Sequence, residues 1–204
     1  MIQPPTGPRQ LLASASASRK ALQQQAGLRY EAVAAQIDEA SVKSAARAEG
    51  ATAAETALLL ADLKAARIAR REPDALVIGC DQILVCEERW FDKPADRAEA
   101  RAHLIALRGR AHTLVTAVLC RKGEQRLWHH VATPRLVMRD YSDAFLDTYV
   151  AAEGDALTST VGAYRLEGLG VHLFDAVVGE HAAVLGLPLL PLLGFLRQNR
   201  VLLP

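Results

Sequence analysis

The chain has little cysteine, almost no net charge and no long hydrophobic segment. Its three cysteines, Cys80, Cys86 and Cys120, are odd in number and form no CxxC pair. This pattern argues against a disulfide framework and against a structural zinc site. The formal net charge is +1 over 204 residues, so the composition provides no electrostatic attraction toward nucleic acid or a membrane surface. We therefore expect neither of these as a partner.

The longest uncharged run, residues 181–196, contains Pro188 and Pro191. It is too short and too interrupted for a membrane helix of ~20 residues. Residues 1–8 are rich in proline and have no apolar signal core, so we predict a loose N-terminal tail there and a cytoplasmic location. Half of the residues are hydrophobic and 23% are charged, as is usual for a globular protein with a substantial core.

The order of the expected elements indicates an α/β fold. Short runs rich in β-branched residues predict strands, and apolar positions three and four residues apart predict helices. The expected strands are 10–14, 30–34, one starting at 75, 111–121, 126–139 and 171–178. The expected helices are 18–26, 53–70 behind a capping box, 96–107, 142–152 and one opened by Pro188. Because strands and helices alternate before a β-hairpin, we predict a mixed, twisted sheet.

Asp81 is the most informative residue, because it interrupts an apolar run. Val77-Ile78-Gly79-Cys80 precedes it, and apolar residues resume at Ile83. A carboxylate in such a run has little water, so it must be paired, metal-bound or protonated. Carboxylates in that position are functional-site candidates. The alternative is an aspartate that only caps a loop.

A serine-rich turn, Ser14 to Ser18, lies between the first strand and the first helix. Backbone N–H groups and hydroxyls at a helix N-terminus can hold phosphate oxygens, and Arg19 adds a two-pronged donor. The glycine pattern of a P-loop is absent. An ordinary serine- and alanine-rich helix cap is the alternative interpretation.

Each of the other charged residues allows a functional and a purely structural interpretation. Asp38-Glu39 follows an apolar segment, where acidic pairs are usually solvated loop residues. Lys64 lies among the apolar positions of a predicted helix, where most lysines extend to solvent. Lys93 precedes Pro94, which restricts its backbone to an extended conformation. A thiol nucleophile at Cys80, with His103 or His112 as base, is disfavoured because a small cysteine in a strand is normally a core residue.

Taken together, these residues indicate one chemistry more strongly than any of them does alone. Two carboxylate positions, two lysines, an arginine and a helix N-terminus are present, and no nucleophile–histidine pair is evident. Mg²⁺ binds through one or two carboxylates plus substrate phosphates, and cations neutralise the remaining phosphate charge. The set therefore indicates metal-assisted hydrolysis of a phosphoanhydride.

The chain also resembles the Maf family of nucleotide pyrophosphatases, from about Gln10 to Leu196. The matching motifs follow in family order. They are Leu12-Ala13-Ser14-Ala15-Ser16 through Arg19, Asp38-Glu39, Leu63-Lys64-Ala65, Gly79-Cys80-Asp81-Gln82, Lys93-Pro94, Gly109-Arg110-Ala111-His112, Gly162-Ala163-Tyr164 with Glu167-Gly168-Leu169-Gly170, and Val184-Leu185-Gly186-Leu187-Pro188.

The resemblance implies a single two-lobed domain over residues 9–204, similar to inosine triphosphate pyrophosphatases, with a central cleft. It implies cleavage of a nucleoside triphosphate to the monophosphate and pyrophosphate with Mg²⁺ or Mn²⁺, and roles in removing modified nucleotides and arresting cell division. By the same resemblance, Asp81 would be the general base, and Asp81 and Glu39 would hold the metal. The expected substrate-binding residues are Ser14, Arg19, Lys64, Gln82, Lys93 and Glu167.

The branches of the family differ at a few of these positions. Gln82 and Glu167 resemble the branch that acts on 7-methylguanosine triphosphate, whereas the uridine- and thymidine-selective branch usually has Thr and Gln there. Ser18 stands where the methylguanosine branch has an aromatic residue and where many members have arginine. The choice of base and the oligomeric state, including a homodimer, stay open. A nucleotide-binding regulator of cell division with little turnover is the alternative function.

Overall fold

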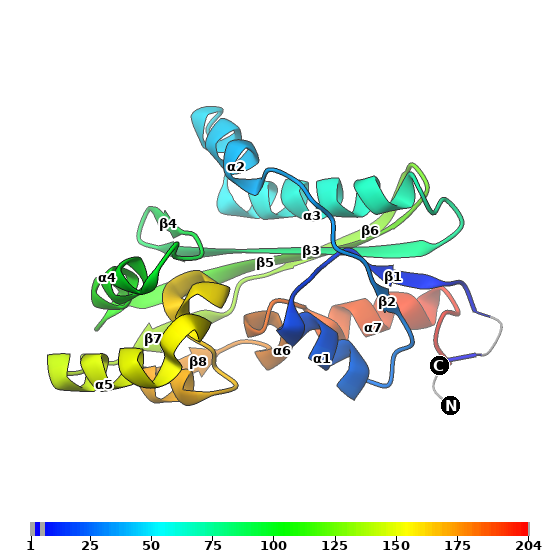
Figure 1. Ribbon diagram of the computed structural model, residues 1–204. Helices are drawn as coiled ribbons and strands as arrows, with labels where there is room; N and C mark the ends of the chain where they lie inside the picture. The colour runs from blue at the N-terminus through cyan, green and yellow to red at the C-terminus, as the bar shows by residue number, and fades with distance from the viewer. Residues whose placement is uncertain (1–2, 5–6, 204) are drawn as a thin grey trace. The chain divides into compact units, whose positions relative to one another are not determined.

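A computed structural model describes residues 3–4 and 7–203 (Figure 1). The predicted loose tail, residues 1–8, lies partly outside this range. The chain forms two compact units. The first comprises residues up to 82, 116–132 and from 181 onward, and the second comprises 83–115 and 133–180. Strands β3 (Leu76–Cys86) and β5 (Ala111–Lys122) run through both units.

In the first unit, a sheet lies between two helical layers. β2 (Glu31–Ala32), β1 (Gln10–Leu12) and β3 pair in parallel, and β5 pairs antiparallel with β6 (Gln125–Ala132). Helix α3 (Ala53–Ala69) covers one face, and Figure 1 shows α1 (Ala17–Gln25), α6 (His181–Val184) and α7 (Leu189–Gln198) on the other. The α/β class with a mixed sheet is thus confirmed.

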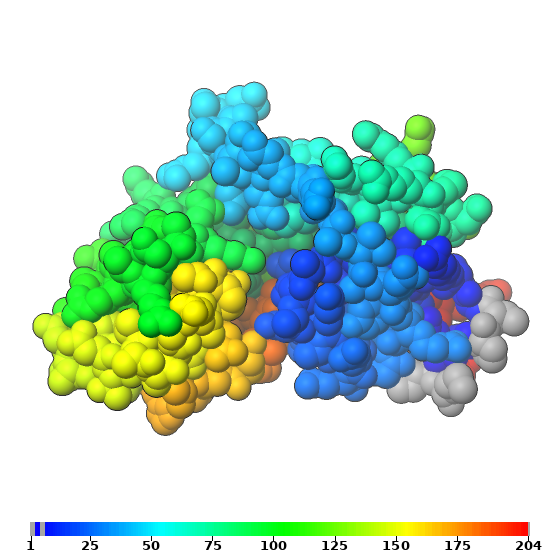
Figure 2. Space-filling model, viewed as in Figure 1, coloured from blue at the N-terminus to red at the C-terminus, as the bar shows by residue number. Residues whose placement is uncertain are grey.

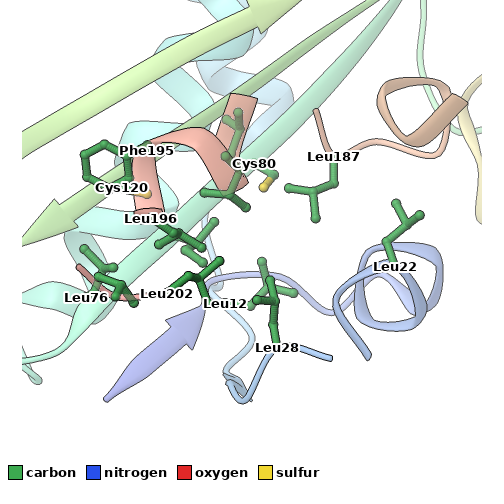
Figure 3. Close-up of a cluster of buried hydrophobic side chains, with 14 residues drawn as sticks. Leu12, Leu22, Leu28, Leu76, Cys80, Cys120, Leu187, Phe195, Leu196 and Leu202 are labelled. Carbon is green, nitrogen blue, oxygen red and sulfur yellow. The ribbon is translucent and has the colours of Figure 1, made fainter. Parts of the chain in front are cut away.

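The core of this unit lies between the sheet and α7. Leu12, Cys80 and Leu187 converge there from β1, β3 and the segment before α7 (Figure 3). Cys80 is fully buried, and burial raises the pKa of its thiol to about 11. The thiol is therefore protonated at neutral pH, which confirms Cys80 as a core residue and rules it out as an activated nucleophile.

The second unit contains a smaller antiparallel arrangement. β4 (Arg89–Phe91) pairs with the end of β3, and β7 (Arg135–Met138) pairs with the start of β5 and with β8 (Phe174–Val178). The unit also contains helix α4 (Arg97–Leu107) and helix α5 (Asp143–Glu153). Helix α5 is followed by the 3-10 segments η1 (Gly154–Ser159), η2 (Val161–Ala163) and η3 (Leu169–Leu173). Within the described residues, no helix has the length and apolarity to cross a membrane.

Three local predictions were wrong. The strand expected over 126–139 is broken at Thr133-Pro134, because a proline has no N–H to donate to a ladder. The strand expected over 171–178 begins only at Phe174, since the apolar residues before it form η3. Asp38-Glu39 begins a helix, α2 (Glu39–Ala48), in which the Asp38 side chain accepts from the Ser41 N–H. The space-filling view shows α2 at the surface (Figure 2).

Candidate functional site

The candidate site lies at the carboxyl end of the parallel strands of the first unit. The Ala13 N–H donates to the Ile78 carbonyl, so the Ser14–Arg19 turn after β1 lies alongside residues 78–82 of β3. In open α/β sheets this edge is where ligands usually bind. The strand β1 ends here because the polar, alanine-rich turn that follows it cannot continue an apolar strand.

Asp81 lies inside β3 and faces α3. Its side chain is 5% exposed, and its Oδ1 accepts from Lys64 Nζ at 2.5 Å. Among the described residues, no side-chain or backbone group donates to Oδ2, which is also buried. The predicted pairing of this carboxylate is therefore confirmed, and one buried oxygen remains for a ligand.

Lys64 links Asp81 to Glu39. The Lys64 Nζ lies 2.7 Å from Glu39 Oε1, and the Lys64 side chain is only 9% exposed. The alternative of a lysine that extends into solvent is therefore wrong. The capping box predicted for this helix is confirmed, because Thr52 and Glu55 bond each other's backbone N–H groups. It fixes the start of α3 and thereby the turn that presents Lys64.

The Ser14–Arg19 turn is held by its own side chains. The Ser16 hydroxyl caps α1 by accepting from the Arg19 N–H, and Ser14 Oγ accepts from the Ser16 N–H at 3.2 Å. Arg19 donates through Nη1 to Ser14 Oγ and the Cys80 carbonyl, and through Nε to the Gly186 carbonyl. Three of its five N–H bonds are thus used, and within residues 3–4 and 7–203 no group accepts from the Nη2 amino group, which is left for a ligand.

Gln82 follows Asp81 but faces the opposite side of the sheet. Its Nε2 lies 2.8 Å from Thr116 Oγ1 and 3.1 Å from each of the Ala183 and Val184 carbonyl oxygens. Sequence reasoning did not single out Thr116. It is a polar residue within an apolar strand, the same signal that identified Asp81.

The remaining two predicted residues belong to the second unit. Lys93 follows β4 and is exposed, and Glu167 is exposed in the turn between η2 and η3. This turn is anchored by buried neighbours, since Tyr164 OH lies 2.8 Å from His112 Nε2 and Arg165 forms an ion pair with the buried Glu153. The structure thus brings Ser14, Arg19, Glu39, Lys64 and Asp81 together in the first unit.

Known proteins are similar to this chain over most of its length. The family described as Maf-like protein matches residues 9–199. A nucleoside triphosphate pyrophosphatase of Granulibacter bethesdensis is 58% identical over 192 residues, covering 94% of this chain and 98% of that protein. One of the same name from Rhodospirillum rubrum is 49% identical, covering 95% and 96%.

A third relative, a 7-methyl-GTP pyrophosphatase of Rhizobium meliloti, is 45% identical over 188 residues, covering 92% of this chain and 94% of that protein. The chain therefore belongs to the Maf-like protein family, which confirms the resemblance drawn from its motifs.

Proposed function

We propose that the protein hydrolyses nucleoside triphosphates between the α and β phosphates, giving the nucleoside monophosphate and pyrophosphate. The observation that carries this proposal is the buried Asp81 carboxylate, which has one oxygen on Lys64 and a second without a donor among the described residues. A carboxylate held in this way can accept the proton of an attacking water. The names of the similar proteins support the same reaction.

The residues present fit a divalent cation, Mg²⁺ or Mn²⁺. Asp81 Oδ2 is a buried oxygen in need of a partner, and Glu39 shares Lys64 with the same carboxylate. The described residues form no group of three or more His, Cys, Asp or Glu that could hold a metal, so water and substrate phosphates would complete the coordination, as Mg²⁺ prefers. When bound, the cation polarises the phosphate oxygens and neutralises their charge.

The remaining side chains bind and orient the substrate. Lys64 holds one oxygen of Asp81 and so fixes the direction of the other. Ser14 and the Nη2 group of Arg19 hold phosphate oxygens at the N-terminus of α1. Lys93 adds positive charge for the triphosphate, and Glu167 accepts hydrogen bonds from the base. The resemblance also assigns Gln82 to the substrate, but its contacts indicate a different role.

The test is pyrophosphate release from a panel of natural and methylated nucleoside triphosphates, with Mg²⁺, with Mn²⁺ and with chelator. We expect release from at least one of them and its loss with chelator. Tight nucleotide binding without release would instead favour the regulator of cell division. A cytoplasmic location and a role in removing modified nucleotides are part of the same proposal.

A further inference from the structure

The side chains of Asp81 and Gln82 lie on opposite faces of β3. Successive side chains of a strand point to opposite faces. Asp81 contacts Lys64 of α3, whereas Gln82 contacts Thr116 and the Ala183 and Val184 carbonyls, on the face covered by α6 and α7. Adjacency in the sequence therefore does not place both side chains at the same ligand.

The hydrogen bonds of Gln82 are set by its neighbours. Carbonyl oxygens only accept, so the amide nitrogen of Gln82 must face Ala183 and Val184. The single hydroxyl hydrogen of Thr116 goes to the Ala183 carbonyl at 3.0 Å, and its oxygen accepts from Gln82. Thr116 is fully buried. One N–H of the Gln82 amide thus goes to Thr116 Oγ1, and the other is shared by the Ala183 and Val184 carbonyls, so Gln82 and Thr116 together hold the 183–186 segment.

The 183–186 segment in turn holds Arg19. Its last carbonyl, that of Gly186, accepts from Arg19 Nε at 2.7 Å. Gly186 has φ +95, and a Cβ there would lie 3.0 Å from Arg19 Nε, so both the backbone and the space require glycine. Arg19 then reaches Ser14 Oγ and the Cys80 carbonyl through Nη1. One continuous path of hydrogen bonds leads from Thr116 to the Ser14–Arg19 turn.

We infer that Gln82 and Thr116 are positioning residues, which hold the 183–186 segment so that Arg19 and Ser14 are aimed at the substrate phosphates without touching the nucleotide themselves. This inference rests on the proposed function for what Arg19 binds. It reassigns Gln82 from substrate contact to support, and it adds Thr116, which lies in none of the family motifs quoted above.

Kinetics of Gln82→Met and Thr116→Val test this assignment, with Thr116→Ser as the conservative variant that keeps the hydroxyl. We expect Gln82→Met and Thr116→Val each to lower kcat/KM roughly three- to tenfold, which corresponds to the loss of one hydrogen bond. The factor should be the same for every base. Thr116→Ser should keep wild-type activity. In an Arg19→Ala background the same substitutions should cost less than about twofold, because coupled residues are not additive.

Direct contact with the nucleotide gives a different result. If Gln82→Met changes the ratio of kcat/KM between two bases, or if its cost persists without Arg19, the positioning role is overturned. Thr148→Val is a matched control, since the exposed Thr148 hydroxyl donates to the Ala144 carbonyl of its own helix. It should leave kcat/KM unchanged.

Hydrogen exchange separates this inference from the proposed function. The amides of Leu185, Gly186 and Leu187 donate within the 181–187 turn, so they should exchange faster in folded Thr116→Val than in wild type or Thr116→Ser. Unchanged exchange would overturn the role of Thr116. A wild-type protein that releases no pyrophosphate would overturn the proposed function. The exchange result would still test whether Thr116 holds the 183–186 segment.

Discussion

Gly79 lies two residues before Asp81 on the same face of β3, where that strand packs directly against α3. A Cβ at Gly79 would lie 2.2 Å from the Ala61 carbonyl oxygen and 2.9 Å from the Ala65 Cβ. Lys64 stands between these two alanines in sequence, on the same face of α3. The Lys64–Asp81 ion pair therefore depends on the missing side chain at Gly79.

Gly79→Ala should move α3 away from β3. We expect the free energy of unfolding to fall by about 1–3 kcal/mol, as in other overpacked cores, and pyrophosphate release to fall with it. Denaturant unfolding and steady-state kinetics measure both. Gly194→Ala in α7 is the control, because nothing lies within 4 Å of its added Cβ, and it should gain about 0.5–1 kcal/mol. Equal stability of Gly79→Ala and wild type would contradict the close approach.

Asp81→Asn keeps the size of the side chain and removes its charge. We expect kcat to fall roughly 10²–10⁴-fold, the usual contribution of a general base, with the fold intact by circular dichroism. Asp147→Asn, which breaks the exposed ion pair with Arg101 in the second unit, should keep wild-type kcat. A folded Asp81→Asn variant within a few-fold of wild type would show that the base lies elsewhere.

Lys93→Ala should lower kcat/KM for triphosphates more than for diphosphates, because the triphosphate carries more charge to neutralise, whereas Lys64→Ala should affect both substrates alike, because Lys64 is paired with Asp81 and Glu39. Their effects on stability should differ. Lys64 is buried against two carboxylates, so its loss should cost roughly 3 kcal/mol or more, whereas the exposed Lys93 should cost almost nothing. The measurements are the urea midpoint of each variant and its kcat/KM for a triphosphate and for a diphosphate. An equal loss for the two substrates in Lys93→Ala would count against a role of Lys93 in neutralising phosphate charge.

Glu167→Gln should shift base preference. A carboxylate accepts from the adjacent N1–H and 2-amino group of guanine, whereas uracil and thymine present one N3–H between two carbonyls, which an amide satisfies better. We expect wild type to prefer guanine-type triphosphates, methylated ones included, and the variant to move toward uridine or thymidine triphosphate. An unchanged ratio of kcat/KM would mean that Glu167 only orders its loop.

His112 should make stability depend on pH. Burial lowers the pKa of His112 to about 4 from an ordinary 6.5, so between these values the unfolded chain binds a proton that the native protein does not. The His112 contribution is thus full above pH 6.5 and is lost as the pH falls toward 4. Between pH 7 and pH 5 it amounts to about 2 kcal/mol.

Urea unfolding at pH 7 and pH 5 measures this loss. His112→Gln is the comparison, because glutamine keeps a polar partner for Tyr164 OH and does not titrate in this range. Burial also lowers the pKa of His103, so some dependence should survive in the variant. An identical dependence in both proteins would show that His112 protonates as easily folded as unfolded.

Local patterns predicted most elements of the first unit. The capping box at Thr52 fixed the start of α3, and the apolar run around Asp81 predicted both β3 and a paired carboxylate. Helix α2 was missed because alanine and polar residues make up most of it and Ala46 is its only buried residue, so no run of large apolar side chains marks it.

The partners within the site could not be read in the same way. Lys64 and Asp81 are 17 residues apart on different elements, and no periodicity links a helix position to a strand position. The resemblance to the family supplied those residues, but as a set without geometry. It also grouped Gln82 with Asp81, although the alternation of a strand separates their side chains.

The bond between Arg19 and the Gly186 carbonyl has a consequence for the timing of synthesis. Its two residues are 167 positions apart, a distance that a ribosome covers in roughly ten to thirty seconds. During that interval the Ser14–Arg19 turn has been made but the segment that holds it has not. A chain terminated before Gly186 would therefore carry every acidic and basic residue of the cluster without the carbonyl that holds Arg19.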